Sequence, residues 1–238
     1  MSIKIQNKKL VKSFNKKKFN FKKIFSEYLL NSEAETLSQI HLNLDKKYIP
    51  KEIMKEFQDQ NSLFYEVLYG VDPGYNLVTP LEDGIFLKTY KELISYISDE
   101  IFNEKIIYQA KPTLRIQFPN NKAVGGWHRD RDYNHPIEEI NFWVPVTEAC
   151  NTNSIWIESS FNKQDFSPVN IPFGKMLIFD SGLMHGNKIN TENKTRISFD
   201  FRVIPLSKYS PKQLIKKSNL SIAQQIEFSI GKYYGISN

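Results

Sequence analysis

The stretch WHRDRDYNHP at residues 127–136 concentrates side chains that can bind a metal ion. It holds two of the four histidines of the 238-residue chain, together with two aspartates. His128 and Asp130 are two positions apart, and residues i and i+2 of an extended segment point to the same side, so an imidazole and a carboxylate can reach one ion. Asp132 shares this parity but lies further into the turn-like sequence Tyr-Asn-His-Pro. The spacing therefore predicts half of a metal site and favours Asp130 over Asp132 as the carboxylate ligand.

A second histidine, His185, can complete such a site. It follows a predicted strand in FDSGLMHGNKIN and is flanked by Gly182 and Gly186. Two histidines and one carboxylate leave open positions on the metal, as in non-haem Fe(II) oxygenases. A cosubstrate such as 2-oxoglutarate would fill two of them, and its distal carboxylate needs a planar, permanently charged partner. Arg196, eleven residues after His185, and the hydroxyl of Ser198 on the same strand face fit that role.

Other side chains near these motifs are weaker candidates. Arg115 can steady the cosubstrate or the substrate, or can form a structural salt bridge with Asp200 or Glu139 instead. Asn141 lies on the predicted inward face of its strand and is a candidate for a hydrogen bond in the pocket. Trp127 is expected to pack beside the iron. We therefore group Arg115 and Asn141 with the cofactor-binding residues.

The rest of the opening loop provides candidate substrate contacts. Pro136 and the asparagine before His135 favour a turn. A turn can bring neighbouring side chains back over the mouth of the pocket, although solvent is the usual environment of charged loop residues. The candidates are Arg131, Asp132, Tyr133 and His135. Asp180 is expected to cap the turn before the second histidine rather than to bind metal.

The elements that must position these residues change character at about residue 112. PTLRIQFP, EEINFWVPVT and KTRISFDFRV each alternate apolar and polar residues, which is typical of strands, and SIWIESS and KMLIFDS are shorter strands between them. The polar faces carry Arg, Gln, Asn, Trp, Asp and Ser rather than Lys and Glu, which suits a polar cavity better than bulk solvent. The predicted fold class is α+β, with a double-stranded β-helix (jelly-roll, cupin-like) barrel over about 108–205.

Helices are expected outside the barrel, mainly over residues 34–104. Thr89 and Glu92 form a capping box before an apolar stripe from Tyr90 to Ile101, and Pro50 can start another helix. A closing helix is predicted over about 211–235, with a second capping box at Ser221 and Gln224. Whether this helix packs on the barrel or makes a contact in a homo-oligomer stays open.

Charge divides the chain into a short basic arm and one domain. Residues 1–26 contain nine lysines and no acidic residue, so the remaining 212 residues carry 23 basic and 26 acidic side chains. We interpret 1–26 as a solvated arm, dispensable for the site, and 27–238 as a single domain without the basic stripe of a nucleic-acid binder. No stretch approaches the roughly 20 apolar residues of a membrane helix, and the N-terminus lacks the features of a signal peptide. The lone Cys150 fits a reducing, cytoplasmic setting.

The order of the motifs is more specific than any one of them. H-x-D, a distant His after a strand, then Arg with Ser two residues later fall at matching places relative to the predicted strands. In WHRD, INFWVPVTEACNTNSIWIESS, FDSGLMHGN and TRISFDFR, over about 112–205, the chain resembles the Fe(II)/2-oxoglutarate-dependent dioxygenase superfamily. It looks like the phytanoyl-CoA-dioxygenase-like branch, and most like its streptomycin-biosynthesis-associated subgroup. The Asn153–Ser154 pair departs from the Asn-Gly common in that branch.

The resemblance implies a ligand set and an activity. His128, Asp130 and His185 would bind Fe(II), and Arg196 with Ser198 would hold the distal carboxylate of 2-oxoglutarate. The presence of a carboxylate ligand argues against halogenase chemistry. The implied reaction uses O2, releases succinate and CO2, and hydroxylates a C–H bond of a small polar metabolite, such as a sugar, amino sugar or nucleotide sugar in a biosynthetic pathway.

Other outcomes remain open from the sequence. Desaturation, ring closure or epimerisation would use the same oxidant. A cupin-like metal-dependent isomerase or epimerase needs no Arg196 and usually has three or more histidine ligands, which this chain cannot easily supply. A carbohydrate-binding jelly roll without catalysis would use the polar face for recognition.

Overall fold

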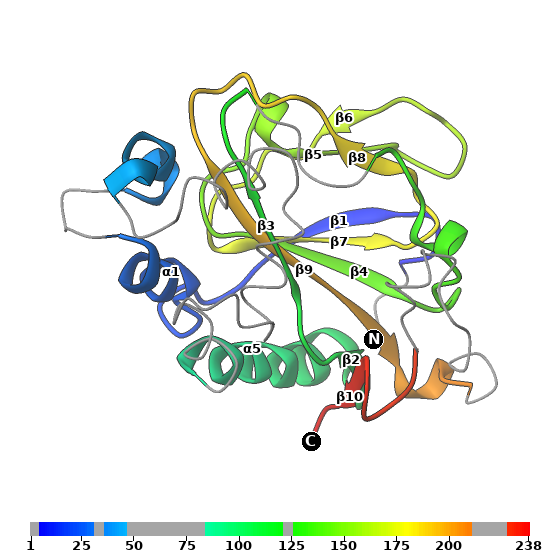
Figure 1. The fold of residues 1–238 in the computed structure, drawn as a ribbon. Helices are drawn as coiled ribbons and strands as arrows, with labels where there is room; N and C mark the ends of the chain where they lie inside the picture. Colours follow the sequence, from blue (N-terminus) through cyan, green and yellow to red (C-terminus); the bar gives the residue numbers. More distant parts are fainter. Residues whose placement is uncertain (1–4, 31–35, 47–83, 121–125, 211–227) are drawn as a thin grey trace.

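The computed structural model describes residues 5–30, 36–46, 84–120, 126–210 and 228–238 (Figure 1). Two sheets form its centre, and every strand pairing in these residues is antiparallel. The larger sheet has seven strands in the order β1-β7-β4-β9-β2-β10, with β3 also paired to β9. Its strands are β1 (Lys9–Ser13), β2 (Ile106–Gln109), β3 (Thr113–Gln117), β4 (Ile140–Pro145), β7 (Lys175–Asp180), β9 (Arg196–Pro205) and β10 (Tyr234–Ile236). The smaller sheet, in the order β6-β5-β8, comprises β5 (Ile155–Ile157), β6 (Ser167–Pro168) and β8 (His185–Asn187).

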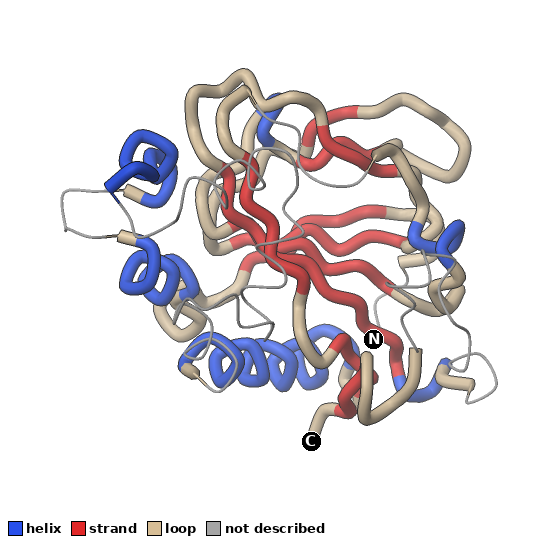
Figure 2. Tube along the Cα trace, in the orientation of Figure 1, coloured by secondary structure: helices blue, strands red, loops and turns tan. Residues whose placement is uncertain are grey.

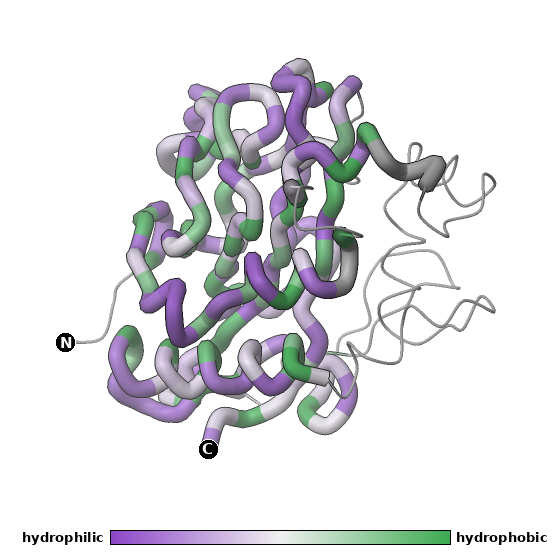
Figure 3. Tube along the Cα trace, turned by 90° about the vertical axis from the view of Figure 1, so that its left-hand side faces the viewer, coloured by the Kyte–Doolittle hydropathy of each residue, from purple (hydrophilic) through white to green (hydrophobic). Residues whose placement is uncertain are grey.

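The described α-helices lie on one side of the larger sheet, and the smaller sheet lies on the other (Figures 1 and 2). The α-helices are α1 (Phe21–Leu29) and α5 (Ile85–Tyr96), and a π-helical segment (Ile97–Phe102) continues α5. Short 3₁₀ helices span Leu37–Lys46, Asp130–Tyr133, Asn151–Asn153 and Leu206–Lys208. None of the helices in the described residues has the length and apolar character of a membrane-spanning helix. Figure 3 shows hydrophilic and hydrophobic residues alternating over short distances along the chain.

Alternation along β9 separates an apolar core from a polar interior. Ile197, Phe199 and Phe201 belong to the main core with the apolar faces of α1 and α5, where each fully buried ring stabilises the fold by about 1.5–3 kcal/mol. The intervening residues point to the opposite face of the sheet. A second apolar cluster joins this face to the smaller sheet and contains Trp143 of β4 and Ile155 of β5. The predicted strands are confirmed, and the polar residues of β9 are buried between the two sheets rather than exposed to solvent.

Helix α5 confirms the predicted apolar stripe but not the predicted cap. Tyr90, Leu93, Ile94, Ile97 and Ile101 are all buried in the main core. The helix begins one turn earlier than expected, with Gly84 as its N-cap, and the threonine of the proposed capping box is a buried residue inside the helix. The apolar stripe, rather than the local capping signal, therefore decides where this helix lies.

The prediction of a separate basic arm at 1–26 is wrong from Ile5 onward. Lys9–Ser13 form the edge strand β1, which pairs with β7. Phe14, Phe19 and Phe21 are buried in the main core, while the lysines beside them are exposed. The lysines dominate the charge of this segment and hide its aromatic pattern, so net charge alone gives the wrong interpretation.

The predicted closing helix over 211–235 is wrong for its last part. Tyr234–Ile236 form strand β10, which pairs with β2, and a turn precedes it. Gly231 at the turn has φ +88°, which favours glycine, and a Cβ at Gly235 would come within 2.9 Å of the Tyr108 ring. Residues 211–227, with Ser221 and Gln224, lie outside the described residues, as does the helix expected at Pro50.

Candidate metal centre

The two histidines of the predicted site are joined through their backbones. The amide of His128 donates to the carbonyl of His185, and the amide of His185 donates back, each over 3.0 Å. His185 is the first residue of β8, so this isolated antiparallel bridge brings the 127–136 loop against the smaller sheet. Gly186 permits this close approach, because a Cβ there would come within 2.9 Å of Trp127.

The side chains of both histidines converge on Asp130. Oδ1 of Asp130 lies 3.4 Å from Nε2 of His128 and 4.0 Å from Nε2 of His185. One ligand atom from each of the three residues lies within 4.8 Å of the other two. The structure thus brings together the three residues that the sequence singles out.

The other ring nitrogen of each histidine is held by the backbone. Nδ1 of His128 lies 2.7 Å from the carbonyl of Gly126, and Nδ1 of His185 lies 3.0 Å from the carbonyl of Leu183. A carbonyl can only accept a hydrogen bond, so each Nδ1 carries the proton and each Nε2 keeps a lone pair for a metal. Burial, with a contribution from the nearby His128, lowers the pKa of His185 to about 4, so this imidazole is neutral at pH 7.

Asp130 presents its two carboxylate oxygens to different partners. While Oδ1 faces the histidines, Oδ2 accepts hydrogen bonds from Nδ2 of Asn141 at 2.8 Å and from Nε and Nη2 of Arg202 at 3.2 and 3.1 Å. Burial acts to raise the pKa of Asp130, but the Arg202 guanidinium holds it well below its ordinary value. The group is therefore a carboxylate, which is the form that binds a cation.

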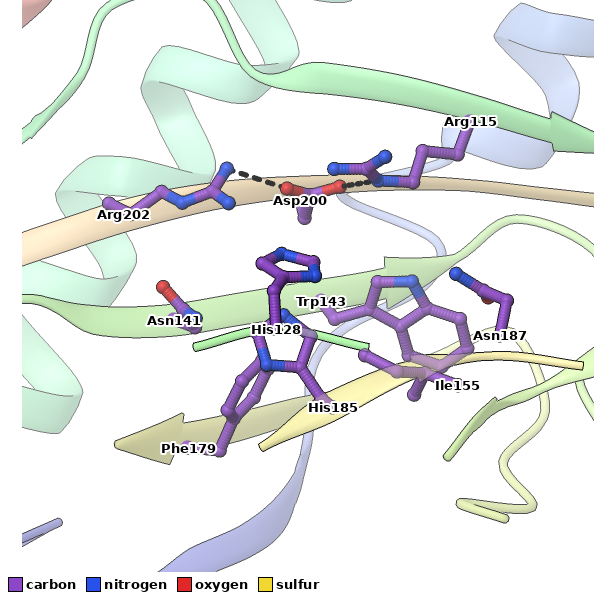
Figure 4. Close-up of a pocket in the computed structure, with 10 residues that line it drawn as sticks. All are labelled: Arg115, His128, Asn141, Trp143, Ile155, Phe179, His185, Asn187, Asp200 and Arg202. Atoms are coloured by element: carbon purple, nitrogen blue, oxygen red, sulfur yellow. Dashed lines mark hydrogen bonds and ion pairs between the residues drawn. The ribbon is translucent and has the colours of Figure 1, made fainter. Parts of the chain in front are cut away.

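Three charged side chains extend from Asp130 along one wall of the pocket. Nη1 of Arg202 donates to Oδ2 of Asp200 over 2.6 Å, and Nε of Arg115 donates to Oδ1 of Asp200 over 2.6 Å (Figure 4). Burial acts to raise the pKa of Asp200, but these two guanidinium groups lower it. Of the two roles open to Arg115, the structure shows the salt bridge with Asp200, and the residue also lines the pocket.

A pocket opens beside the histidines between the two sheets. Figure 4 shows Asn187 and Trp143 on one side of the histidines, and Asn141 and Arg202 on the other. The lining residues are Arg115, His128, Asn141, Trp143, Ile155, Phe179, His185, Asn187, Asp200 and Arg202. The pocket therefore joins the two histidines to the polar faces of β3, β4 and β9, the three strands whose alternation the sequence shows.

Arg196 and Ser198 lie behind the wall formed by Asn187 and Trp143. Nη1 of Arg196 donates to Oδ1 of Asn187 over 2.9 Å, and its guanidinium lies 5.7 Å from the centroid of the Trp143 ring. Nε and Nη2 of Arg196 and Oγ of Ser198 are buried and have no hydrogen-bond partner. Burial, with repulsion from Arg115, lowers the pKa of Arg196 to about 9. A buried cation with idle donors is costly unless an anion approaches it.

The four candidate substrate residues do not line the pocket. Nη2 of Arg131 donates to Oδ1 of Asp180 over 2.6 Å, so this arginine secures the loop instead. Asp132 is exposed and lies in the 3₁₀ turn, where its carboxylate accepts from the backbone of Arg129. Tyr133 is 38% exposed and its ring meets the His128 ring edge-to-face at 5.7 Å. Tyr133 therefore contacts one of the two histidines of the predicted site.

His135 belongs to a separate buried cluster. Its Nδ1 lies 2.7 Å from Oε2 of Glu139, and the hydroxyl of Tyr234 donates to Oε1 of Glu139. Its ring packs against Phe228, so the C-terminal segment covers it. Although Asp130, His135 and Glu139 also have ligand atoms close together, Arg202 already occupies the outer oxygen of Asp130 and repels a cation there. We interpret this cluster as a structural hydrogen-bond network.

Two further residues near the predicted site serve the loops. Asp180 accepts from the amide of Gly182 over 2.7 Å and so caps the turn before the second histidine, as the sequence predicts. Trp127 is 38% exposed and stacks on Phe166, with ring centroids 4.3 Å apart. Ser154, where glycine is common in the branch that the sequence resembles, donates to the carbonyl of Val169 and thereby fixes the turn before β5.

The sequence analysis missed Arg202 and Asn187. Arg202 is on the same face of β9 as Arg196 and Ser198, so the alternation that identifies those two residues also indicates it. Asn187 follows His185 by two positions, the spacing that places His128 and Asp130 on one side. The alternation along each strand therefore indicates both residues.

Comparison with known proteins identifies a relative. No family model matches the chain. Over 147 residues it is 36% identical to the streptomycin biosynthesis protein StrG of Streptomyces griseus, a match that covers 61% of this chain and 67% of the relative. The chain belongs to the StrG family. The wider phytanoyl-CoA-dioxygenase-like branch stays a prediction.

One solved structure supports the fold of this StrG-family chain, and a second is reported beside it. EctD from S. alaskensis, in its apo form, is similar with a TM-score of 0.52 and 12% identity, over 85% of this chain and 75% of that one. A structure titled CytC3 with Fe(II) and alpha-ketoglutarate gives a TM-score of 0.47 and 14% identity, over 88% of this chain and 78% of that one. At 12% identity the similarity to EctD concerns the fold alone, so the function is argued from the site.

Proposed function

We propose that this protein is an Fe(II)- and 2-oxoglutarate-dependent oxygenase. The observation that carries the proposal is that two histidines of an open His-Asp-His group line a pocket, and that a buried arginine with idle donors is hydrogen-bonded to Asn187, which lines the same pocket. The first supplies metal ligands and the second supplies an anion site. A metal isomerase needs only the first, and a carbohydrate-binding domain needs neither in this combination.

The metal ligands in this proposal are Nε2 of His128, Nε2 of His185 and Oδ1 of Asp130. Two imidazoles and one carboxylate are the donor set of non-haem Fe(II) oxygenases, and they leave positions open for cosubstrate and O2. The hydrogen bonds from Nδ1 of both histidines to backbone carbonyls fix the tautomer that such a site requires. When bound, iron and 2-oxoglutarate would together supply an oxidant from O2, with succinate and CO2 as by-products.

Arg196 and Ser198 would hold the distal carboxylate of 2-oxoglutarate. The unpartnered Nε and Nη2 of Arg196 can form a paired contact with a carboxylate, and the Ser198 hydroxyl can donate a third hydrogen bond. Asn187 orients the guanidinium through Nη1. An anion bound there would also offset the burial of the Arg196 charge and its repulsion from Arg115, which together lower the pKa of Arg196.

The remaining lining residues would orient the reactants and exclude water. Trp143, Ile155 and Phe179 give the pocket an apolar wall close to the histidines, which keeps water from competing at the open positions. Asn141 and Arg202 act on the carboxylate ligand rather than on the cosubstrate, so the predicted cofactor-binding role of Asn141 becomes a role behind the metal. Fixed placement of the reacting atoms is the protein's main contribution to such a reaction.

The proposed substrate is a small polar metabolite in a biosynthetic pathway, with a sugar, amino sugar or nucleotide sugar as the favoured class. The name of the related protein StrG, which refers to streptomycin biosynthesis, supports a biosynthetic role. The polar groups along the pocket wall support a polar rather than a long acyl substrate. Hydroxylation of a C–H bond is the proposed outcome.

Anaerobic titration with Fe(II) and then 2-oxoglutarate tests the proposal. Chelation of Fe(II) by a 2-oxo acid gives a visible metal-to-ligand charge-transfer band, which neither a metal isomerase nor a lectin-like domain develops. We expect the band in the unchanged protein and its absence in Asp130→Ala at the same concentrations. Absence of the band in the unchanged, folded protein at saturating Fe(II) and 2-oxoglutarate would refute the proposal.

A further inference from the structure

The carboxylate ligand Asp130 is held at one oxygen only. Oδ2 accepts one hydrogen bond from Asn141 and two from the Arg202 fork, within 2.8–3.2 Å. Oδ1 faces the two histidines instead. The two oxygens of one carboxylate thus have different environments, and only one is available to a metal.

Arg202 is itself fixed in place by further contacts. Its Nη1 donates to Oδ2 of Asp200 over 2.6 Å and lies 3.3 Å from Oε1 of Gln109, which is also buried. Asp200 is in turn bound by Arg115 from its other side. The guanidinium therefore has carboxylate partners on two edges and cannot rotate away from Asp130 without breaking a buried ion pair.

Asn141 completes the arrangement from a different strand. Its amide nitrogen is the atom that faces Asp130, because two acceptor oxygens would repel each other. Its Oδ1 is buried, has no hydrogen-bond partner, and belongs to a residue that lines the pocket. Strands β4 and β9 pair Asn141 directly with Arg202, so the sheet itself sets the spacing of the two donors.

We infer that Arg202 and Asn141 are positioning residues that restrict Asp130 to binding the metal through Oδ1 alone. This inference rests on the proposed metal site. A carboxylate free at both oxygens can chelate a cation with both and so occupy a second position on it. With Oδ2 engaged, that position stays free for the cosubstrate, O2 or substrate.

Co(II) titration tests the inference without catalytic turnover, because the visible spectrum of bound Co(II) reports its coordination number. The variants are Arg202→Lys, which removes the fork but keeps a charge, and Asn141→Ala, which leaves the ion pairs intact. Arg131→Lys is the matched control. Like Arg202, Arg131 forms an ion pair with an aspartate, Asp180, over 2.6 Å, but Asp180 is not a proposed metal ligand. Circular dichroism and thermal unfolding establish that each protein is folded.

We expect Arg202→Lys and Asn141→Ala each to bind Co(II) about 10- to 100-fold more weakly, as loss of a partner behind a metal ligand commonly does. Their spectra should shift toward higher coordination as Asp130 becomes bidentate, while Arg131→Lys keeps the affinity and spectrum of the unchanged protein. If Arg202→Lys does not fold, the Co(II) affinity and spectrum of Asn141→Ala test the inference. Unchanged Co(II) affinity and spectrum in a folded Asn141→Ala or Arg202→Lys protein would overturn the inference alone. Failure of the unchanged protein to bind Co(II) would overturn both this inference and the proposed function.

Discussion

At the scale of single residues, the environment of each carboxylate decides which one can serve a metal. Asp130 is 2% exposed, faces Nε2 of both histidines, and has a pKa held low by Arg202 despite its burial. Asp132 has the same sequence parity but lies exposed in the 3₁₀ turn that follows. The turn, rather than the spacing alone, separates the two aspartates.

Substitution of the two aspartates tests this distinction. We expect Asp130→Ala to weaken Fe(II) binding by more than the 10- to 100-fold that loss of a partner behind a ligand costs, because two histidines cannot hold a facial site. Asp132→Ala should bind Fe(II) like the unchanged protein. Anaerobic equilibrium titration provides both affinities. Loss of iron in Asp132→Ala with retention in Asp130→Ala would reverse the assignment.

Arg196 is expected to serve the cosubstrate and not the metal. Arg196→Lys replaces a planar fork by a point charge on a different geometry, so 2-oxoglutarate should bind roughly 10- to 100-fold more weakly, the equivalent of one or two charge-assisted hydrogen bonds. Fe(II) affinity without the cosubstrate should stay unchanged. The two affinities are measured separately by anaerobic titration. An unaltered 2-oxoglutarate affinity would remove Arg196 from the site.

At the scale of elements, strand pairing determines which residues meet. The β4–β9 register sets Asn141 opposite Arg202, and the bridge between His128 and His185 joins the loop to β8. Both contacts cross large gaps in the sequence. Alternation along one strand predicts which face a residue occupies, but it cannot predict the partner on the next strand, which is why the sequence predicts Arg196 and Ser198 yet misses the ion pair between Arg202 and Asp130.

The N-terminal segment shows that charge composition does not predict strand pairing either. Most of its described lysines are exposed as expected, but Lys9 is half-buried, β1 pairs with β7, and its phenylalanines enter the core. A charge count cannot detect a pairing with a strand more than 150 residues away. Likewise, Arg131 and His135 of the 127–136 loop are bound by Asp180 and Glu139, so these two side chains are not free to line the pocket.

Truncation of one buried ring tests whether this segment belongs to the domain. Phe19→Ala should lower the free energy of unfolding by about 3–5 kcal/mol, because Phe19 is fully buried against the core. Lys17→Ala, at an exposed position of the same turn, should change it by less than about 0.5 kcal/mol. Urea unfolding monitored by circular dichroism gives both values. Equal stability of the two variants would support a separate arm. Deletion of residues 1–23 removes β1 and is expected to destabilise the whole protein.

At the scale of the whole molecule, two sheets and a layer of helices divide the interior into an apolar and a polar part. The apolar part, between the helices and the larger sheet, supplies stability. The polar part, between the two sheets, holds four charged side chains of a single network, from Asp130 through Arg202 and Asp200 to Arg115. The division follows from period-two alternation on β3, β4 and β9, and for this reason the sequence predicts the general architecture and the site's location.

The most direct test of the central claim is the anomalous diffraction of crystals prepared without oxygen in Fe(II) and 2-oxoglutarate. The account predicts an iron peak bound by Nε2 of His128, Nε2 of His185 and a single oxygen of Asp130, with the distal carboxylate of 2-oxoglutarate on Arg196 and Ser198. An iron peak at any other group of residues, or an iron site with the cosubstrate carboxylate away from Arg196, would contradict it.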